Sequence, residues 1–165
     1  MEVIQAPSDT DFAKMAVIID CEANIAIHRH TNHRTYRLHL TVGSTDFRLL
    51  DWCLARFGGA IYENFYRKQN PRQAHAKRWR LEGQDVCNLL RMCLPHFIIK
   101  REQAEIAIRF QGTFGKRWER VNETDRLLRE ELKRNLQALT KRGPRPAVKE
   151  PAKKEIKDNL FSEEI

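Results

Sequence analysis

Hydrophobic residues recur along this chain with two different periods, and the changes between them mark the expected elements. Over residues 12–19 the spacing is three or four residues, which predicts a helix that begins at the capping sequence 8–11 and ends near Asp20. Over residues 36–42 hydrophobic and polar residues alternate strictly, which predicts a strand with one buried face.

The same two patterns predict a complete domain between residues 8 and 112. Strands are expected at residues 25–28, 36–42, 61–65 and 77–81. Helices are expected at residues 8–20, 46–57, 84–94 and 100–111. Two helix–strand–strand halves and a closing helix, the order αββαββα, predict an α+β fold with the helices on one face of an antiparallel sheet.

Beyond this domain the hydrophobic pattern weakens. Residues 118–140 contain a charged helix with leucines on one side. Residues 141–165 are rich in proline and lysine and poor in aromatic residues, which is typical of a disordered tail.

The charge of the chain points to its partner. The formal net charge is +8 over 165 residues, which favours a polyanion, nucleic acid before a membrane surface. The positive residues concentrate on the predicted strands and their connecting loops, and a β-ribbon fits the DNA major groove. We expect contacts to double-stranded DNA from His28, His30, Arg37, His39, Thr41, Tyr62, Asn64, Arg78 and Arg80. The alternative is a solvated sheet face with no such partner.

Other features narrow the class of protein. The four cysteines form no CxxC pair and are expected to be small core residues of a protein in a reducing, intracellular compartment. His28 and His30 have no carboxylate or cysteine beside them, so we expect no zinc site there. Neither a signal peptide nor a membrane-spanning run is expected, and we predict no membrane partner.

Two carboxylates, Asp20 and Glu22, stand where the first predicted helix meets the first strand. Acids at this end oppose the helix dipole, which favours a functional reason for their presence. The stretch 15–25 resembles the LAGLIDADG motif of homing endonucleases: residues 18–20 match Leu-Ile-Asp, and Glu22 stands at the second acid. Residues 94–104, with Pro, Lys and Gln-Ala at the expected separations, are similar to the closing segment of that family.

This resemblance implies a fold and an activity. The fold would be a single-motif LAGLIDADG domain with a saddle-shaped sheet. The activity would be site-specific, metal-dependent cleavage of double-stranded DNA, as in enzymes encoded by introns and other mobile elements. The resemblance also implies an intracellular location, in the cytoplasm of a bacterial or phage-infected cell or in an organelle. Glu22 would bind Mg²⁺ or Mn²⁺, Lys100 would stabilise charge or orient solvent, and Asp20 would support the helix end. A single motif implies a homodimer through the helix at 12–19.

Three positions depart from the family pattern and keep other functions open. Val17 and Ala23 replace glycines, and Ser44 stands near the position of a larger polar residue. The second reading is therefore a catalytically inactive DNA- or RNA-binding protein on the same fold, such as a maturase or regulator. The third is an interaction module whose C-terminal helix recruits a partner.

Overall fold

The structure is a computed structural model that describes residues 6–29, 35–63, 75–114 and 122–140. Its elements, in chain order, are α1 (Asp9–Glu22), β1 (Ala23–Arg29), β2 (Tyr36–Ser44), α2 (Phe47–Phe57), β3 (Ala60–Glu63), β4 (Lys77–Glu82), α3 (Gln84–Cys93), the 3₁₀ helix η2 (Leu94–His96), α4 (Arg101–Gly112) and α5 (Glu123–Thr140). The predicted α+β class and element order are confirmed.

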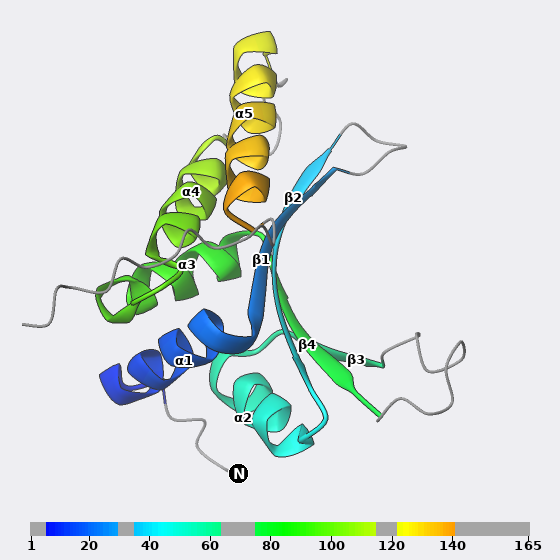
Figure 1. Cartoon of the computed structure of the whole chain (residues 1–165), viewed down its shortest axis with the longest axis vertical. Helices are drawn as coiled ribbons and strands as arrows, with labels where there is room; N and C mark the ends of the chain where they lie inside the picture. The colour runs from blue at the N-terminus through cyan, green and yellow to red at the C-terminus, as the bar shows by residue number, and fades with distance from the viewer. Residues whose placement is uncertain (1–5, 30–34, 64–74, 115–121, 141–165) are drawn as a thin grey trace, which may run out of the picture.

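The four strands form one antiparallel sheet in the order β1-β2-β4-β3. Helices α1, α3 and α4 lie on one side of this twisted sheet, and the other side carries no helix among the described residues (Figure 1). Successive residues of each strand therefore point alternately to the face that packs on the helices and to the open face. This arrangement is the predicted one, with the helices on one face.

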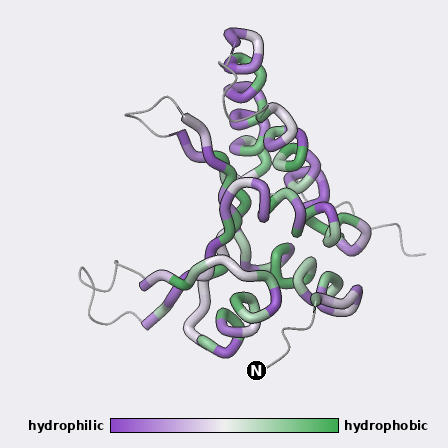
Figure 2. The backbone as a smooth tube through the Cα atoms, turned by 180° about the vertical axis from the view of Figure 1, so that it is seen from behind, coloured by the Kyte–Doolittle hydropathy of each residue, from purple (hydrophilic) through white to green (hydrophobic). Residues whose placement is uncertain are grey.

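The core lies between the sheet and its helices. Along β2 the buried residues alternate with exposed or half-buried ones from Tyr36 to Val42, as the sequence pattern predicts. In Figure 2 green hydrophobic positions lie along the middle of the sheet and on the helices packed beside it. Trp79 of β4 is fully buried, and its indole Nε1 donates a hydrogen bond to the Gly58 carbonyl at 2.7 Å.

Gly59 follows at a φ of 88°, a backbone conformation that favours glycine. A Cβ atom at Gly59 would lie 2.5 Å from the Arg80 carbonyl oxygen. This close approach lets the chain turn from α2 directly into β3.

Local signals set several boundaries correctly. Ser8 and Asp11 form the predicted capping box, with Ser8 Oγ accepting from the Asp11 amide and Asp11 accepting from the Ser8 amide. Asp46 caps α2 through a hydrogen bond from the Arg48 amide at 3.0 Å.

Other boundaries differ from the sequence prediction. Helix α1 ends at Glu22 rather than near Asp20, so both acids lie in its last turn. Strand β2 continues to Ser44 because residues 43–44 still pair with β4. Strand β3 is described to Glu63, and the rest of the predicted strand, including Asn64, lies outside the described residues.

The cysteine prediction was wrong at one position. Cys53, Cys87 and Cys93 are buried, and burial raises the pKa of Cys53 and Cys93 to about 12. Cys21 is exposed, because it lies on the side of α1 that no described element covers.

Helix α5 packs against α4 and β1, and its Leu132 and Leu136 join the core. At its centre the buried Arg129 side chain donates to the Thr113 carbonyl at 2.6 Å and to the Thr113 hydroxyl at 2.9 Å. The Tyr36 hydroxyl donates to Glu130 at 2.5 Å. No helix in the described part of the chain is both long enough and apolar enough to cross a membrane.

Candidate active site and nucleic-acid interface

The first candidate residue, Asp20, joins two segments that are far apart in the sequence. Its side chain is 8% exposed, and its two carboxylate oxygens accept three backbone hydrogen bonds: from Ile98 at 2.8 Å, Ile99 at 3.2 Å and Lys100 at 2.8 Å. These amides lead into α4, so Asp20 occupies the position of a capping carboxylate. Such a group positions the backbone and is poorly placed to bind a metal ion.

Lys100 makes the return contact. Its Nζ donates to the carbonyl oxygens of Ile19 and Ala23, both at 2.7 Å. Helix α1 has no basic residue in its last turn, and Lys100 supplies the cation that the negative end of a helix favours. Burial lowers the pKa of Lys100, while Asp20, Cys21 and Glu22 act in the opposite direction. Its ammonium group has a third N–H that these two bonds do not use.

Glu22 is the exposed acid of the pair. It lines a surface hollow of about 460 Å³ with Gly43, Ser44 and Thr45 from the end of β2 and with Leu49 and Ala76. Asp20 therefore points into the fold and Glu22 to the surface, although one residue separates them. The polar position suspected near Ser44 does lie beside Glu22, and Ser44 Oγ accepts the Asp46 amide hydrogen at 3.0 Å.

One chain offers few metal ligands here. The described residues contain no group of three His, Cys, Asp or Glu side chains that could hold a metal ion. Mg²⁺ is commonly held by one or two carboxylates together with waters and substrate phosphates. The Glu22 carboxylate, open to solvent, fits such a partly hydrated ion if nucleic acid or a second copy supplies the remaining ligands.

The predicted nucleic-acid contacts share one face of the sheet. Cross-strand partners lie on the same face, and the register pairs His28 with Arg37, Thr41 with Arg80, and Tyr62 with Arg78. His39 has the same strand parity as Arg37 and Thr41. All described members of the predicted set therefore lie on the open face; His30 and Asn64 lie outside the described residues.

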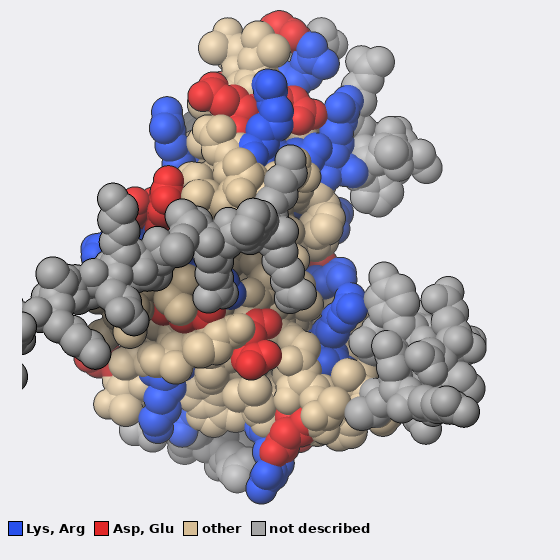
Figure 3. Space-filling model, viewed as in Figure 1, with Lys and Arg blue, Asp and Glu red and all other residues tan. Residues whose placement is uncertain are grey.

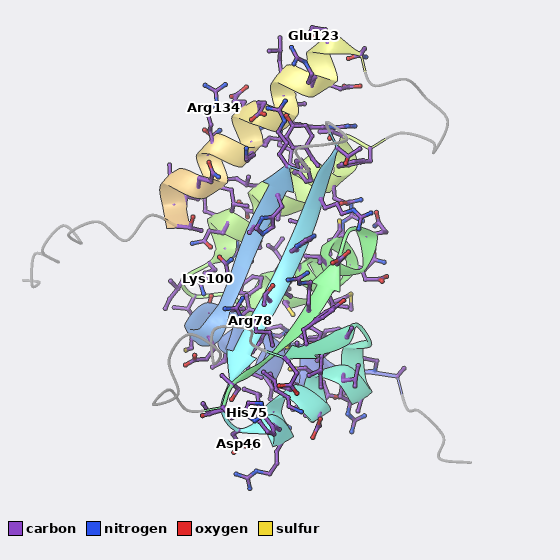
Figure 4. The ribbon with its side chains drawn as sticks, turned by 90° about the vertical axis from the view of Figure 1, so that its right-hand side faces the viewer. Asp46, His75, Arg78, Lys100, Glu123 and Arg134 are labelled. Atoms are coloured by element: carbon purple, nitrogen blue, oxygen red, sulfur yellow. The ribbon has the colours of Figure 1, made fainter. Side chains whose placement is uncertain are left out.

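Figures 3 and 4 show this face from two directions. In Figure 3 a blue group of Lys and Arg side chains projects at mid-height from the right-hand side, where the open face lies. Figure 4 looks onto that side, with Arg78 in the lower half of the sheet and Lys100 beside the end of α1. The basic face adjoins the end of α1 that carries Glu22. Ala23, the residue after Glu22, pairs with Val42, and the next residue of β2, Gly43, lines the same hollow as Glu22.

Side chains on this face contact one another through aromatic rings and through one acid, Glu82. The Arg80 guanidinium lies 5.0 Å from the centre of the Tyr62 ring, and the rings of His28 and His39 are 4.8 Å apart. Burial lowers the pKa of His39, against the opposing effect of Glu82. Two buried atoms on this face, His39 Nε2 and Arg80 Nε, have no hydrogen-bond partner among the described residues.

Sequence reasoning missed two residues of the open face, Asn24 and Glu82. Asn24 pairs with Thr41, and Glu82 pairs with His39. Strand alternation from Arg78 and Arg80 would have found Glu82, had the predicted strand not ended one residue early.

Comparisons with known proteins place the fold. The sequence matches no model of a known protein family, and no curated protein matches it. Solved structures do match. The homing endonuclease I-CvuI in complex with its target, in the presence of Ca, aligns with a TM-score of 0.67 at 17% identity over 85% of this chain and 87% of that one. The archaeal intron-encoded homing endonuclease I-Vdi141I complexed with DNA aligns with a TM-score of 0.68 at 13% identity, over 83% and 88%.

A third structure extends the comparison. The LAGLIDADG homing endonuclease I-GzeII in complex with its DNA target aligns with a TM-score of 0.54 at 15% identity, over 73% of this chain and 41% of that one. The fold is therefore that of the LAGLIDADG homing endonucleases, as the motif resemblance implied. At these identities the comparisons establish the fold, and the activity has to be argued from the residues.

Proposed function

We propose that this protein is a site-specific double-strand DNA endonuclease of homing type that uses Mg²⁺ or Mn²⁺. The observation that carries the proposal is the position of Glu22. Its exposed carboxylate lies in a surface hollow next to an open, basic sheet face, within a fold whose similar structures are endonuclease–DNA complexes. An acid beside a face that binds a polyanion weakens that binding by repulsion. A role of Glu22 in the chemistry would account for its presence there.

Glu22, Lys100 and Asp20 would each have a different role in DNA cleavage. A bound divalent ion would supply a Lewis acid and an activated water for phosphodiester hydrolysis. Glu22 would hold that ion. Lys100, whose ammonium keeps one N–H beyond its two carbonyl contacts, would place positive charge at the same helix end. Asp20 would keep Lys100 there by holding the backbone from Ile98 to Lys100.

Cleavage of both DNA strands calls for two such sites, and we propose that a homodimer provides them. The uncovered side of α1 is largely apolar: Val17 is 54% exposed and lines a hollow of about 390 Å³ with Lys14, Ile18, Leu49 and Trp52. Ile98 and Ile99, at 85% and 69% exposure, extend the apolar surface beside the end of α1. A second copy of α1 related by a two-fold axis would cover this surface and define a near-palindromic target.

A second candidate is a DNA- or RNA-binding protein that does not cut. The observation that favours it is the hydroxyl of Ser44, which is engaged in the turn by the Asp46 amide and is short for positioning water. In a dimer Val17 would also keep the paired helices further apart than the family's glycine would. The third candidate, recruitment through α5, loses support because Leu132 and Leu136 of that helix are buried in this chain.

The decisive experiment is cleavage of DNA from the gene's own genomic neighbourhood by the purified protein, with and without Mg²⁺ or Mn²⁺. Native protein should cut only with metal. Glu22→Gln should cut slower by orders of magnitude. In the absence of metal, Glu22→Gln should bind the same DNA with an affinity equal to that of native protein, or slightly higher. The matched control is Glu131→Gln, which removes an exposed carboxylate on α5.

Two results would contradict the endonuclease proposal. Native protein that binds its DNA and never cuts it, with either metal, would support the second candidate. Equal cutting by native protein and Glu22→Gln would place the metal site elsewhere.

A further inference from the structure

Glu82 is the only acidic residue among the described strand residues of the open face. It ends β4, pairs with His39, and is surrounded by cations from two strands. Its carboxylate oxygens lie 3.4 Å from Arg37 Nη1, 3.6 Å from Arg80 Nη1 and 3.7 Å from His39 Nε2. The proposed function accounts for the basic residues here and leaves the acid unexplained.

Fold stability does not account for Glu82. The side chain is 40% exposed, that of Arg37 is 65% exposed, and the two contacts with arginine are long for ion pairs. Burial lowers the pKa of His39, which disfavours the charged imidazole that a third ion pair would need. Ion pairs of this kind stabilise a fold very little. A carboxylate on a face that approaches phosphates also opposes binding, so its presence calls for a role in recognition.

The chemistry of the DNA major groove supplies such a role. A carboxylate only accepts hydrogen bonds, and the cytosine N4 amino group is a donor in that groove. An arginine pairs best with the O6 and N7 acceptors of guanine. Glu82 and Arg80 carry these complementary preferences and lie on the same face of β4, two residues apart.

The spacing of the strand matches that of the base pairs. Residues i and i+2 of a strand lie roughly 6.6 Å apart, since each residue advances about 3.3 Å. Successive base pairs rise about 3.4 Å, so two steps span nearly the same length. The Tyr62 ring supports the Arg80 guanidinium, and the Arg80 Nε has no hydrogen-bond partner among the described residues. The pair is thus arranged to contact two bases that are two steps apart.

We propose that Glu82 is a specificity-determining residue that reads cytosine, and that Arg80 reads a guanine two base pairs away in each half-site. In the free protein the Glu82 carboxylate faces Arg37 and Arg80 across these long contacts. In the complex it accepts from the cytosine amino group and rejects bases that present only acceptors at that place. This inference rests on the proposed function, because it requires that the open face bind double-stranded DNA.

The test is selection of bound sequences from a randomised DNA library, with Ca²⁺ in place of Mg²⁺. Native protein should select half-sites with a cytosine two base pairs from a guanine. Glu82→Gln should lose the cytosine preference, a discrimination of about 5- to 150-fold for one good base contact, and should keep the preferences elsewhere. Glu82→Lys, which turns an acceptor into a donor, should select guanine at that same position.

Controls separate this inference from the proposed function. Glu63→Gln removes a carboxylate that pairs with His75 and Lys77 at the end of the sheet, and it should leave every preference unchanged. Thermal unfolding should show that all variants are folded. If Glu82→Gln selects the same bases as native protein, the inference is overturned while DNA binding stands. If native protein binds no DNA at all, the proposed function itself fails.

Discussion

Asp20 and Lys100, eighty residues apart, cap each other's helices: Asp20 of α1 caps the start of α4, and Lys100, the N-cap residue of α4, caps the end of α1. The Asp20 carboxylate receives the amides that begin α4, and the Lys100 ammonium binds the carbonyls that end α1. Their two functions are coupled, since any movement of Lys100 also moves the helix end that carries Glu22. Glu22 is thereby presented by a doubly anchored helix terminus rather than by a loop.

The reciprocal caps predict a separation between stability and chemistry. Asp20→Asn keeps the shape of the side chain but replaces one accepting oxygen by a donor, which faces backbone N–H groups. Unfolding by denaturant should show a loss of about 1–3 kcal/mol, the usual cost of an unsatisfied buried polar group. Glu22→Gln, at an exposed position, should change stability by less than about 0.5 kcal/mol.

Lys100→Met tests the other half of the same relationship. We expect slower cleavage than in native protein, but a smaller loss than Glu22→Gln causes, because Lys100 holds no metal in the proposed scheme. Cleavage rates of the two variants on one DNA substrate give the comparison. The reverse order would move the metal-binding role toward Lys100's surroundings and away from Glu22.

The apolar side of α1 predicts the oligomeric state. Val17→Asp should give monomers in sedimentation velocity experiments and abolish double-strand cleavage, because it places a charge in the proposed interface. Lys14→Ala, on the same exposed side, serves as a control for a change that leaves the apolar surface intact. If the native chain sediments as a monomer even with DNA present, the two-site mechanism is ruled out.

The C-terminal region should divide at the end of α5. Truncation after Arg142 removes a segment whose composition predicts little burial, and the thermal unfolding midpoint should stay within a degree or two. Leu136→Ala should instead cost about 2–5 kcal/mol, as for other buried leucines, because Leu136 is 2% exposed. A large drop on truncation would show that the tail packs on the domain.

The contact between Tyr36 and Glu130 predicts a pH dependence. The hydrogen bond from the Tyr36 hydroxyl is the main reason why the pKa of Glu130 is lowered from 4.5. A carboxyl group with a lowered pKa in the fold contributes stability above pH 4.5 and loses it as the pH falls through its folded pKa. Glu130→Gln should reduce stability at pH 7 and flatten the acid limb of a plot of unfolding free energy against pH. An unchanged acid limb would show that α5 is held by its leucines and Arg129 alone.

Salt should weaken DNA binding strongly. Arg37, Arg78 and Arg80 on the open face would displace counterions condensed on the DNA phosphates, so the logarithm of affinity should fall linearly with the logarithm of salt concentration. Fluorescence anisotropy over a salt series measures the slope, and Arg78→Gln should make it shallower. A flat slope for native protein would remove nucleic acid as the main partner.

The sequence alone predicted the elements and their order, because periodicity and caps are local. The alternation in β2, the capping box at Ser8 and Asp11, and the stop at Gly58 and Gly59 each follow from a few neighbouring residues. With these came the α+β class and the motif resemblance that the structural comparisons bear out at the level of the fold.

Tertiary structure decided what the local patterns leave open. Asp20 and Glu22 look alike in the sequence, yet Asp20 is buried under the start of α4 and Glu22 lies in a surface hollow. A helix turns its side chains by about 100° per residue, so the two acids point in different directions. Only the packing of the helix determines which of its sides is covered. Glu82 lies among Arg37, His39 and Arg80 for a similar reason: a strand's own residues set its two faces, but the register between distant strands sets the neighbours on each face.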